Sequence, residues 1–292
     1  MGTIRIATRA SAQARTQAES VAARLVDAGH EAELVFIETF GDRTQADEVP
    51  LHSIGGQGVF VKEVQRAVLD GRADVAVHSA KDLPTGVADG LHIAAFTERR
   101  DAADALVGRP LVELPSGATV ATGSVRRRAQ LRRARPDLEF VELRGNIHTR
   151  LEKVPAGGSI VMAVAALEIL GLTDRIAERL DPAEFVPAVG QGCVAVECRA
   201  DDDKVIVALA RIDHEPTRRE VLVERAFLAE LGSGCSLPVG AYVDGAKLYA
   251  FLADEMSGIT VSETIALSGE LDADIELARR TARDAHEHVL GG

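Results

Sequence analysis

In the first hundred positions, the spacing of hydrophobic residues switches repeatedly between a period of about two, which is typical of a β-strand, and a period of about 3.6, which is typical of an α-helix. The alternating run Ile4–Thr8 predicts a strand, and the amphipathic stretch Ala12–Ala28, ended by Gly29, predicts the helix that follows it. The same reasoning predicts strands at residues 33–39, 74–79 and 92–97 and a helix at residues 59–69, stopped by Gly71. Strands that alternate with helices are typical of a parallel, doubly wound sheet.

The pattern restarts after a predicted hinge at Glu98–Asp101. It predicts a strand at 119–121, a helix at 125–134, and strand–helix pairs at 138–143 with 147–154 and at 160–164 with 165–170. A second hinge is expected around Pro187–Gly192, and the strand Cys193–Cys198 could return to the first unit. Two such units joined by a double crossover face each other across a cleft, where ligands collect at strand carboxyl ends and helix N-termini.

The pattern changes again from Thr217 onward. A helix at 217–231, the glycine-flanked loop Gly232–Ser236, three strands (239–243, 248–253 and 259–267) and a closing helix at 274–290 predict a small α+β domain. We therefore expect domain 1 at 1–97 with 191–213, domain 2 at 101–187 and domain 3 at 217–292.

Composition narrows the function classes. The 292 residues carry a formal net charge of −12 and contain no Trp, two Tyr and eight Phe, which argues against a nucleic-acid surface. No apolar run approaches the ~18 residues that a membrane span needs, and the N-terminus shows no secretory pattern. The three cysteines lack the paired spacing of a zinc site, so we expect a cytoplasmic protein without a structural metal.

Against this acidic background, residues 121–150 contain eight arginines. Ser124 is the predicted N-cap of the helix 125–134, so Arg126 and Arg127 fall in its first turn, where the macrodipole disfavours cations and free N–H groups suit an anion. A local rule broken at one place usually marks function, and we expect these two arginines to bind an anion. Arg132, Arg133 and Arg135 near the C-terminus of this helix fit a solvated face.

Further arginines lie where predicted strands end or helices begin, at Arg9, Arg144 and Arg150. The planar guanidinium suits carboxylate or phosphate, and the absence of a GxxxxGK[ST] motif argues against a phosphate-loop nucleotide site. Arg9, Arg126, Arg127, Arg144 and Arg150 are therefore expected to line the cleft.

Two other side chains could carry chemistry. Asp82 follows the strand 74–79 at its carboxyl end, where it either caps the turn before Pro84 or stabilises a developing cation or moves a proton. Cys235 lies in the glycine-flanked loop, where a thiol can be reactive or derivatised. His78, Cys193 and Cys198 lie within predicted strands, and buried structural roles are the simpler interpretation for them.

The chain resembles the porphobilinogen deaminase (hydroxymethylbilane synthase) family. The segments that carry the resemblance, in chain order, are RIATR (5–9), GGQGVFVKEVQRAVLDGRADVAVHSAKDLPT (55–85), RRDAADALV (99–107), ATGSVRRRAQL (121–131), LRGNIHTRL (143–151), AVAALEILGL (163–172), PAVGQG (187–192), VAVECR (194–199) and ERAFLAELGSGCSLPVGAY (224–242). They span nearly the whole chain, and HSAKDLP together with the cysteine loop is highly specific.

The resemblance implies two periplasmic-binding-protein-like doubly wound domains and a third domain that carries the cysteine. It implies that four porphobilinogen molecules are condensed head to tail, with release of ammonia, to give hydroxymethylbilane. The growing chain stays on a dipyrromethane cofactor, which a thioether joins to Cys235, and Asp82 acts on the pyrrole nitrogens. Implied cofactor contacts are Ser79, Lys81, Thr122, Ser124, Arg126, Arg127 and Gly145. Implied substrate contacts are Arg9, Ser11, Phe60, Arg144, Arg150 and Gln191.

The sequence also departs from the family pattern. Gln57 replaces a usual Lys, Gly123 stands where Ser is common, and Ala12-Gln13 stands where Pro-Leu is common. Ala166 and Ile169 occupy places usually held by Gly and a substrate-gripping Arg. Our hypothesis is that Arg128 or Arg175 replaces the missing guanidinium.

Two alternatives remain open at this stage. One is a catalytically impaired relative, or a two-lobed protein that only binds a small polycarboxylate. Ala166 and Ile169 favour it, whereas Asp82 and Cys235 favour the enzyme. The other is an unrelated cysteine-nucleophile hydrolase, although no His has a motif-supported place beside Cys235. For the enzyme we expect a cytoplasmic monomer whose partner is the small-molecule substrate, with no nucleic acid and no membrane.

Overall fold

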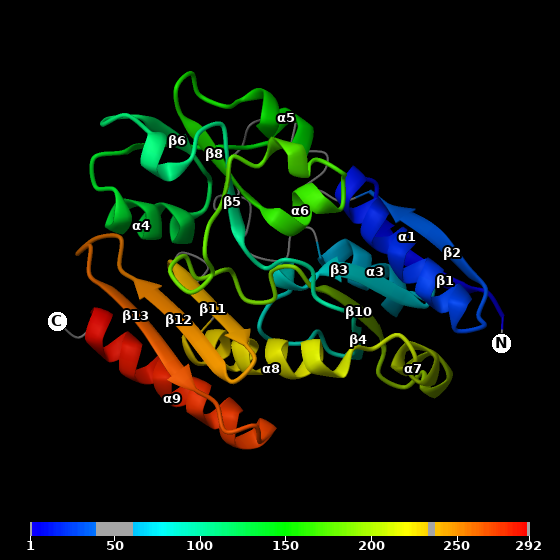
Figure 1. The fold of residues 1–292 in the computed structure, drawn as a ribbon. Helices are drawn as coiled ribbons and strands as arrows, with labels where there is room; N and C mark the ends of the chain where they lie inside the picture. The colour runs from blue at the N-terminus through cyan, green and yellow to red at the C-terminus, as the bar shows by residue number, and fades with distance from the viewer. Residues whose placement is uncertain (1, 39–60, 233–236, 291–292) are drawn as a thin grey trace. The chain divides into compact units, whose positions relative to one another are not determined.

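The computed structural model describes residues 2–38, 61–232 and 237–290 (Figure 1). The chain divides into two compact units. Unit 1 comprises Met1–Arg99 and Cys193–Arg218, and unit 2 comprises Arg100–Gly192 and Arg219–Gly292. The chain therefore leaves unit 1 after Arg99, returns to it at Cys193, as the predicted double crossover requires, and leaves it again after Arg218. The cleft between the lobes and the boundaries of three separate domains stay predictions.

Unit 1 is built on a five-stranded sheet in the order β2-β1-β3-β10-β4. Its strands are β1 (Ile4–Arg9), β2 (Ala32–Ile37), β3 (Val75–Ser79), β4 (Leu91–Phe96) and β10 (Val194–Arg199). β1 pairs in parallel with β2 and β3, but β10 runs antiparallel to both β3 and β4. The sheet is thus mixed rather than wholly parallel. The returning chain enters at the carboxyl edge, with Val194 opposite Ser79, so β10 must run the other way.

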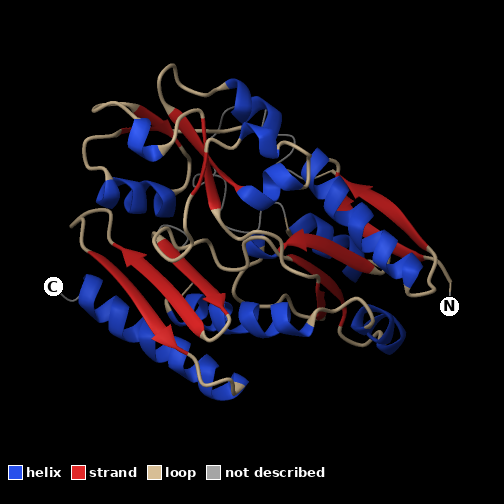
Figure 2. Ribbon diagram, in the orientation of Figure 1, coloured by secondary structure: helices blue, strands red, loops and turns tan. Residues whose placement is uncertain are grey.

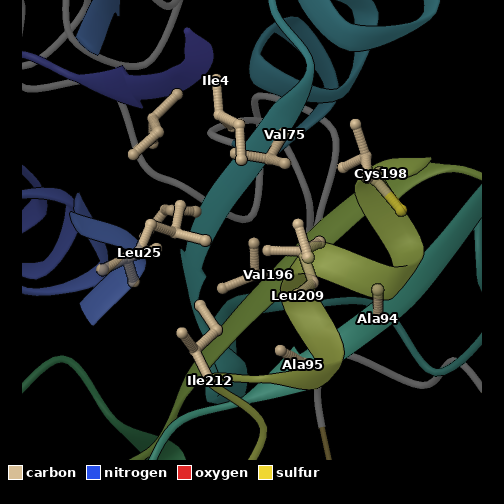
Figure 3. Packing of buried hydrophobic residues seen from close by; sticks show 14 of the residues in the cluster. Ile4, Leu25, Val75, Ala94, Ala95, Val196, Cys198, Leu209 and Ile212 are labelled. Atoms are coloured by element: carbon tan, nitrogen blue, oxygen red, sulfur yellow. The ribbon is translucent and has the colours of Figure 1, made fainter. Parts of the chain in front are cut away.

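The unit 1 sheet is covered by helices on both faces, which explains why its strands are almost continuously apolar. Helices α1 (Ala12–Asp27) and α7 (Asp203–Ala210) pack on the face that carries Val75 and Val77. Figure 3 shows part of the buried hydrophobic cluster that these helices form with the sheet. Helix α3 (Lys62–Leu69) packs on the opposite face, against Ala76. Because side chains alternate between the two faces of a strand, successive residues of β3 contact helices on opposite sides of the sheet. Helix α7 was not expected from the sequence.

The first sheet of unit 2 has the order β7-β6-β8-β5-β9. Figure 2 shows the described strands in red and the described helices in blue, in the orientation of Figure 1. Its strands are β5 (Asp104–Val107), β6 (Thr119–Ala121), β7 (Glu139–Val141), β8 (Ser159–Ala163) and β9 (Glu178–Arg179). Its helices are α4 (Val125–Ala134), α5 (Ile147–Glu152) and α6 (Val164–Glu168), with short 3-10 turns at Leu111–Glu113 and Thr173–Arg175. β6, β7 and β8 are parallel, whereas β5, which the sequence analysis missed, is antiparallel to β8 and β9.

The remainder of unit 2 is the expected small α+β arrangement. Strands β11 (Val239–Asp244), β12 (Lys247–Ala253) and β13 (Thr260–Ala266) form an antiparallel sheet in that order. Helices α8 (Glu215–Glu230) and α9 (Leu271–Leu290) share its core, in which Phe227 and Ala282 are fully buried. None of the described helices is long and apolar enough to cross a membrane.

Gly158, which precedes β8, allows the backbone of β8 to lie close to that of β6, and a substitution there tests the packing of these two strands. A Cβ at Gly158 would overlap the carbonyl oxygen of Thr119. We expect Gly158→Ala to lower the free energy of unfolding by roughly 1–3 kcal/mol, because the neighbouring backbone must shift. Gly86→Ala is the control, since no atom lies within 4 Å of its Cβ and its φ is not positive. Urea titration of both variants checks this, and equal stabilities would contradict the described packing.

Candidate active site

In unit 1, the predicted site residues gather at the carboxyl edge of β1 and β3. Because these strands are parallel neighbours, their last residues, Arg9 and Ser79, lie at the same edge of the sheet. Ser11 caps helix α1, where its hydroxyl accepts a hydrogen bond from the backbone N–H of Ala14 at 3.4 Å. Lys81 and Asp82 lie in a single 3-10 turn, Ala80–Asp82, directly after β3. The edge thus brings together a guanidinium, two hydroxyls, an ammonium and a carboxylate.

The turn that carries Asp82 is held by its backbone, which leaves the carboxylate accessible. The N–H of Ala80 donates to the carbonyl of Cys193 at 3.0 Å, and Leu83 N–H closes the turn on the carbonyl of Ala80 at 3.3 Å. Ala80 and Leu83 are buried on either side, whereas Asp82 is exposed. This arrangement agrees with the interpretation of Asp82 as a group that meets a ligand.

The hydroxyl of Ser79 is engaged by helix α1. Gln17 Nε2 donates to Ser79 Oγ at 2.9 Å, Ser79 Oγ lies 3.2 Å from Gln17 Oε1, and Gln13 Nε2 lies 3.5 Å away. The two glutamines are one helical turn apart and so reach the same point. Ser79, which the resemblance assigns to the cofactor, is therefore oriented by the amides of α1.

In unit 2, the predicted residues meet at the corresponding edge of the sheet. Thr122 follows β6, and Ser124 caps helix α4, accepting a hydrogen bond from the N–H of Arg127 at 3.4 Å as the sequence predicted. Thr122 Oγ1 in turn accepts from the N–H of Ser124 at 3.2 Å. β5 runs antiparallel and therefore begins at this edge, where its first residue, Asp104, pairs with Ala163 at the end of β8.

The anion that Arg126 and Arg127 hold belongs to the chain itself. Arg126 Nη2 lies 2.8 Å from Asp104 Oδ2, and Arg127 reaches Asp104 Oδ1 with Nε at 3.0 Å and Nη2 at 2.6 Å. Arg126 Nη1 also donates to the carbonyl of Val186, and Arg127 Nη1 donates to that of Val161. The prediction of anion binding at this helix N-terminus did not foresee an internal carboxylate. Two guanidinium groups and one carboxylate leave one net positive charge.

Gln191 belongs to the same cluster. Its Nε2 donates to Asp104 Oδ1 at 2.8 Å and to the carbonyl of Ala102 at 2.7 Å, and the side chain is buried. Gln191 was predicted to contact substrate, and the structure places its amide nitrogen against Asp104. Its role towards a substrate stays a prediction.

The electrostatics of the cluster follow from these contacts. Burial by itself raises the pKa of the Asp104 carboxyl, but the charges of Arg126 and Arg127 and the hydrogen bonds from Arg127 and Gln191 bring it well below its ordinary value. Burial lowers the pKa of the Arg126 guanidinium, against the raising effect of Asp104. Arginine stays protonated in proteins, so the cluster is an ionised triad at neutral pH.

Arg144 and Gly145 lie in the loop between β7 and α5, and Arg150 lies in the last turn of α5. Gly145 has a φ of 112°, and a Cβ there would overlap the side chain of Thr149, so the position requires glycine. Arg150 Nε donates to the carbonyl of Gly145 at 2.7 Å, and Asn146 caps α5. This loop follows the carboxyl end of β7, beside β6, so Arg144 and the Asp104 cluster belong to one sheet edge, and Arg150 is tied to this loop through Gly145.

Two predicted site residues, Phe60 and Cys235, lie outside the described residues. Of the two arginines suggested to replace the guanidinium missing at Ile169, Arg128 is held by Glu255, with Nη2 2.6 Å from Oε1. Arg175 is exposed in the turn Thr173–Arg175 and is therefore the better candidate.

The residues assigned structural roles are buried as expected. His78 Nε2 lies 3.1 Å from Glu197 Oε2 but has no hydrogen-bond partner among the described residues, and both side chains are nearly inaccessible. Cys193 and Cys198 are buried thiols that form no disulfide, and burial raises the pKa of the Cys198 thiol to about 11. Within the described residues no group of three or more His, Cys, Asp or Glu side chains could hold a metal ion.

Asp104 is the site residue that sequence reasoning missed. It lies in the segment RRDAADALV, which carries part of the family resemblance, but the resemblance implies no role for this carboxylate. The available signal was an acidic residue inside the apolar run Ala102–Val107, since an ionised carboxylate is almost never buried without a cationic partner.

The ionised state of Asp104 predicts a pH dependence of stability. A carboxyl whose folded pKa lies below its unfolded pKa of ~3.9 contributes its full stabilisation above that pH and loses it as pH falls towards the folded pKa. Wild type should therefore take up one more proton on unfolding below pH ~4 than Asp104→Asn does. Urea titrations at pH 5 and pH 3 should show the stability gap between the two proteins narrowing by about 1 kcal/mol. A constant gap would contradict the assignment.

Comparison with known proteins gives a consistent result over the whole chain. Residues 4–207 match the family described as porphobilinogen deaminase, dipyromethane cofactor binding domain, and residues 218–284 match the porphobilinogen deaminase C-terminal domain. The porphobilinogen deaminase of Acidothermus cellulolyticus is 47% identical over 97% of this chain and 88% of its own length. That of Syntrophus aciditrophicus is 44% identical over 82% and 80%.

Similarity to solved structures is much weaker. A periplasmic substrate-binding protein of an ABC transporter from Coxiella burnetii is 15% identical and has a TM-score of 0.42 over 73% of this chain and 93% of its own. The assignment therefore rests on the family matches and on the two relatives. By these matches, which extend over nearly its full length, the chain belongs to the porphobilinogen deaminase family.

Proposed function

We propose that this chain condenses four porphobilinogen molecules head to tail into hydroxymethylbilane, on a dipyrromethane primer that a thioether joins to Cys235. The observation that carries the proposal is the match of residues 4–207 to the cofactor-binding domain of the family. The placement of Asp82 and of the arginines at the carboxyl edges of their sheets supports it.

The charges of the two edges suit the substrate. Each porphobilinogen carries an acetate and a propionate, so a chain of linked units is a polyanion. The guanidinium groups of Arg9 in unit 1 and of Arg144 and Arg150 in unit 2 are suited to carboxylates, which they can bind through paired N–H donors. Ser11 adds a hydroxyl beside Arg9. We assign these residues to the carboxylate arms of the substrate.

Asp82 is the catalytic carboxylate of the proposal. In each condensation the bond between the aminomethyl carbon and nitrogen breaks, and the nitrogen leaves as ammonia. The methylene carbon, now electron-deficient, forms a new C–C bond with the free α-carbon of the acceptor pyrrole, which then loses its proton. An exposed carboxylate beside the ring nitrogens stabilises the positive charge that develops and can accept or return a proton. Water finally supplies the hydroxyl of the released product.

The residues of unit 2 are suited to a dipyrromethane. When bound, this group supplies the first nucleophilic α-carbon. A guanidinium has five N–H donors, and Arg127 commits three of them to Asp104 and Val161, so two can still point to a ligand. The cluster also keeps one net positive charge for a polycarboxylate. We therefore assign Thr122, Ser124, Arg126, Arg127 and Gly145 to the cofactor, together with Ser79 and Lys81 of unit 1.

Tethering the acceptor to one sulfur makes each addition effectively intramolecular, which can supply several kcal/mol of the barrier reduction. We further propose a cytoplasmic location. The thiols of Cys193 and Cys198, which form no disulfide, support it, because reduced thiols persist in reducing compartments. The monomeric state and the absence of a nucleic-acid partner stay predictions.

The covalent cofactor predicts both a mass and a thiol count. Intact wild-type protein should weigh more than its sequence by two linked pyrroles, and Cys235→Ser should remove the excess. After denaturation, wild type should titrate two thiols, those of Cys193 and Cys198, although the sequence contains three cysteines. Cys193→Ser is the control and should keep the excess mass while titrating one thiol. Three thiols in denatured wild type would refute the attachment.

The role of Asp82 predicts a defect in turnover. Asp82→Asn keeps the size of the side chain but removes the negative charge, so kcat should fall by roughly 100-fold or more while KM changes little. Asp89→Asn is the matched control, because Asp89 is an exposed carboxylate in the same connection between β3 and β4. Steady-state release of ammonia measures both variants. Wild-type kcat in Asp82→Asn would exclude the assigned role.

A further inference from the structure

Asp104 is the most heavily bonded carboxylate at the sheet edge of unit 2, and the mechanism above does not use it. Four side-chain donors converge on its two oxygens at 2.6–3.0 Å, namely Arg126 Nη2, Arg127 Nε and Nη2, and Gln191 Nε2. The residue is 1% exposed. Two of the three partners, Arg126 and Arg127, are residues that the proposed function assigns to the cofactor.

The contacts restrict how the two arginines can move. Arg127 meets Asp104 through Nε and Nη2, a paired arrangement that fixes both the position and the plane of the guanidinium. Arg126 is held between Asp104 and the carbonyl of Val186, which lies 2.6 Å from its Nη1. An arginine free in solution has many rotamers, and ordering it on ligand binding costs roughly 0.5–1.5 kcal/mol. Asp104 imposes this order before a ligand arrives.

The carboxylate also sets the charge of the cluster. Arg126 and Arg127 would present two positive charges without it and present one with it. A second cation at this depth would be buried without a counterion, which proteins rarely tolerate. Asp104 therefore makes it possible to keep two guanidinium groups close together beside the N-terminus of α4, where the macrodipole opposes them.

We propose that Asp104 is a positioning residue for the condensation, which orients Arg126 and Arg127 so that the acceptor end of the primer stands at the correct distance from the incoming unit. The inference rests on the proposed function, because it assigns the primer to these two arginines. Asp104 itself contacts neither substrate nor primer in this account. An error of about 1 Å in the placement of a reacting group can cost 100-fold in rate, so the effect of Asp104 should appear in kcat.

A purely structural role makes a different prediction. If Asp104 only stabilised the fold, its replacement would lower the folded fraction, and the remaining folded protein would turn over normally. If Asp104 positions the arginines, folded protein turns over slowly while the affinity for porphobilinogen is preserved. Comparing kcat with KM at a temperature where each variant is folded separates the two.

The central variant is Asp104→Asn, which keeps the shape and removes the charge. We expect kcat to fall roughly 10- to 100-fold, with KM within about 3-fold of wild type and with the two-pyrrole mass still attached. Asp104→Glu restores the charge on a longer side chain and should recover part of the lost kcat. Asp137→Asn is the matched control, since Asp137 is the partner of Arg135 beyond the other end of α4 and is exposed. It should leave kcat unchanged.

Gln191→Met provides a second test that leaves the ion pairs intact. It removes one donor to Asp104 without changing any charge, and it should lower kcat several-fold, less than Asp104→Asn does. If Asp104→Asn does not fold, this variant and Asp104→Glu decide the question.

Wild-type kcat in folded Asp104→Asn, or in both Gln191→Met and Asp104→Glu, would overturn the proposal. Failure of the proposed function itself would look different, because wild type would then carry no added mass or release no ammonia from porphobilinogen.

Discussion

The cationic edge of unit 2 depends on one buried carboxylate. The protein is acidic as a whole, and it places Arg126 and Arg127 at a helix N-terminus, where both the dipole and their mutual repulsion oppose them. Asp104 makes the arrangement stable by neutralising one charge and accepting four side-chain hydrogen bonds. What remains is a rigid pair of guanidinium groups with one net positive charge and spare donors. Such a surface suits a ligand that carries several carboxylates along its length.

The two five-stranded sheets present their functional residues in the same way. In each of these two sheets one strand runs antiparallel to its neighbours, and it therefore starts at the edge where the parallel strands end. β10 starts opposite Ser79 in unit 1, and β5 starts with Asp104 opposite Ala163 in unit 2. These are also the strands that directly follow the crossovers between the units. The crossover segments thus reach the carboxyl edges, where the backbone of Cys193 supports the Asp82 turn and Gln191 supports Asp104.

Much of this arrangement was predictable from the sequence because it depends on local rules. Helix α4 has the predicted bounds and the predicted cap at Ser124, and β10 joins the first sheet as proposed. The pairing of Arg126 and Arg127 with Asp104 was not predictable, because Asp104 lies more than twenty positions before the two arginines and meets them only through strand order. β5 was missed since its four residues carry no periodic pattern of their own, and its antiparallel direction follows from the crossover rather than from its composition.

The central claim is that oligopyrrole growth occurs on this protein, one unit at a time, without release. Intact-mass measurement of wild type mixed with a few equivalents of porphobilinogen tests this most directly. The account predicts a ladder of species above the resting mass, each heavier by one porphobilinogen less one ammonia, and no ladder in Cys235→Ser. A resting mass that does not change while porphobilinogen is consumed would contradict the account.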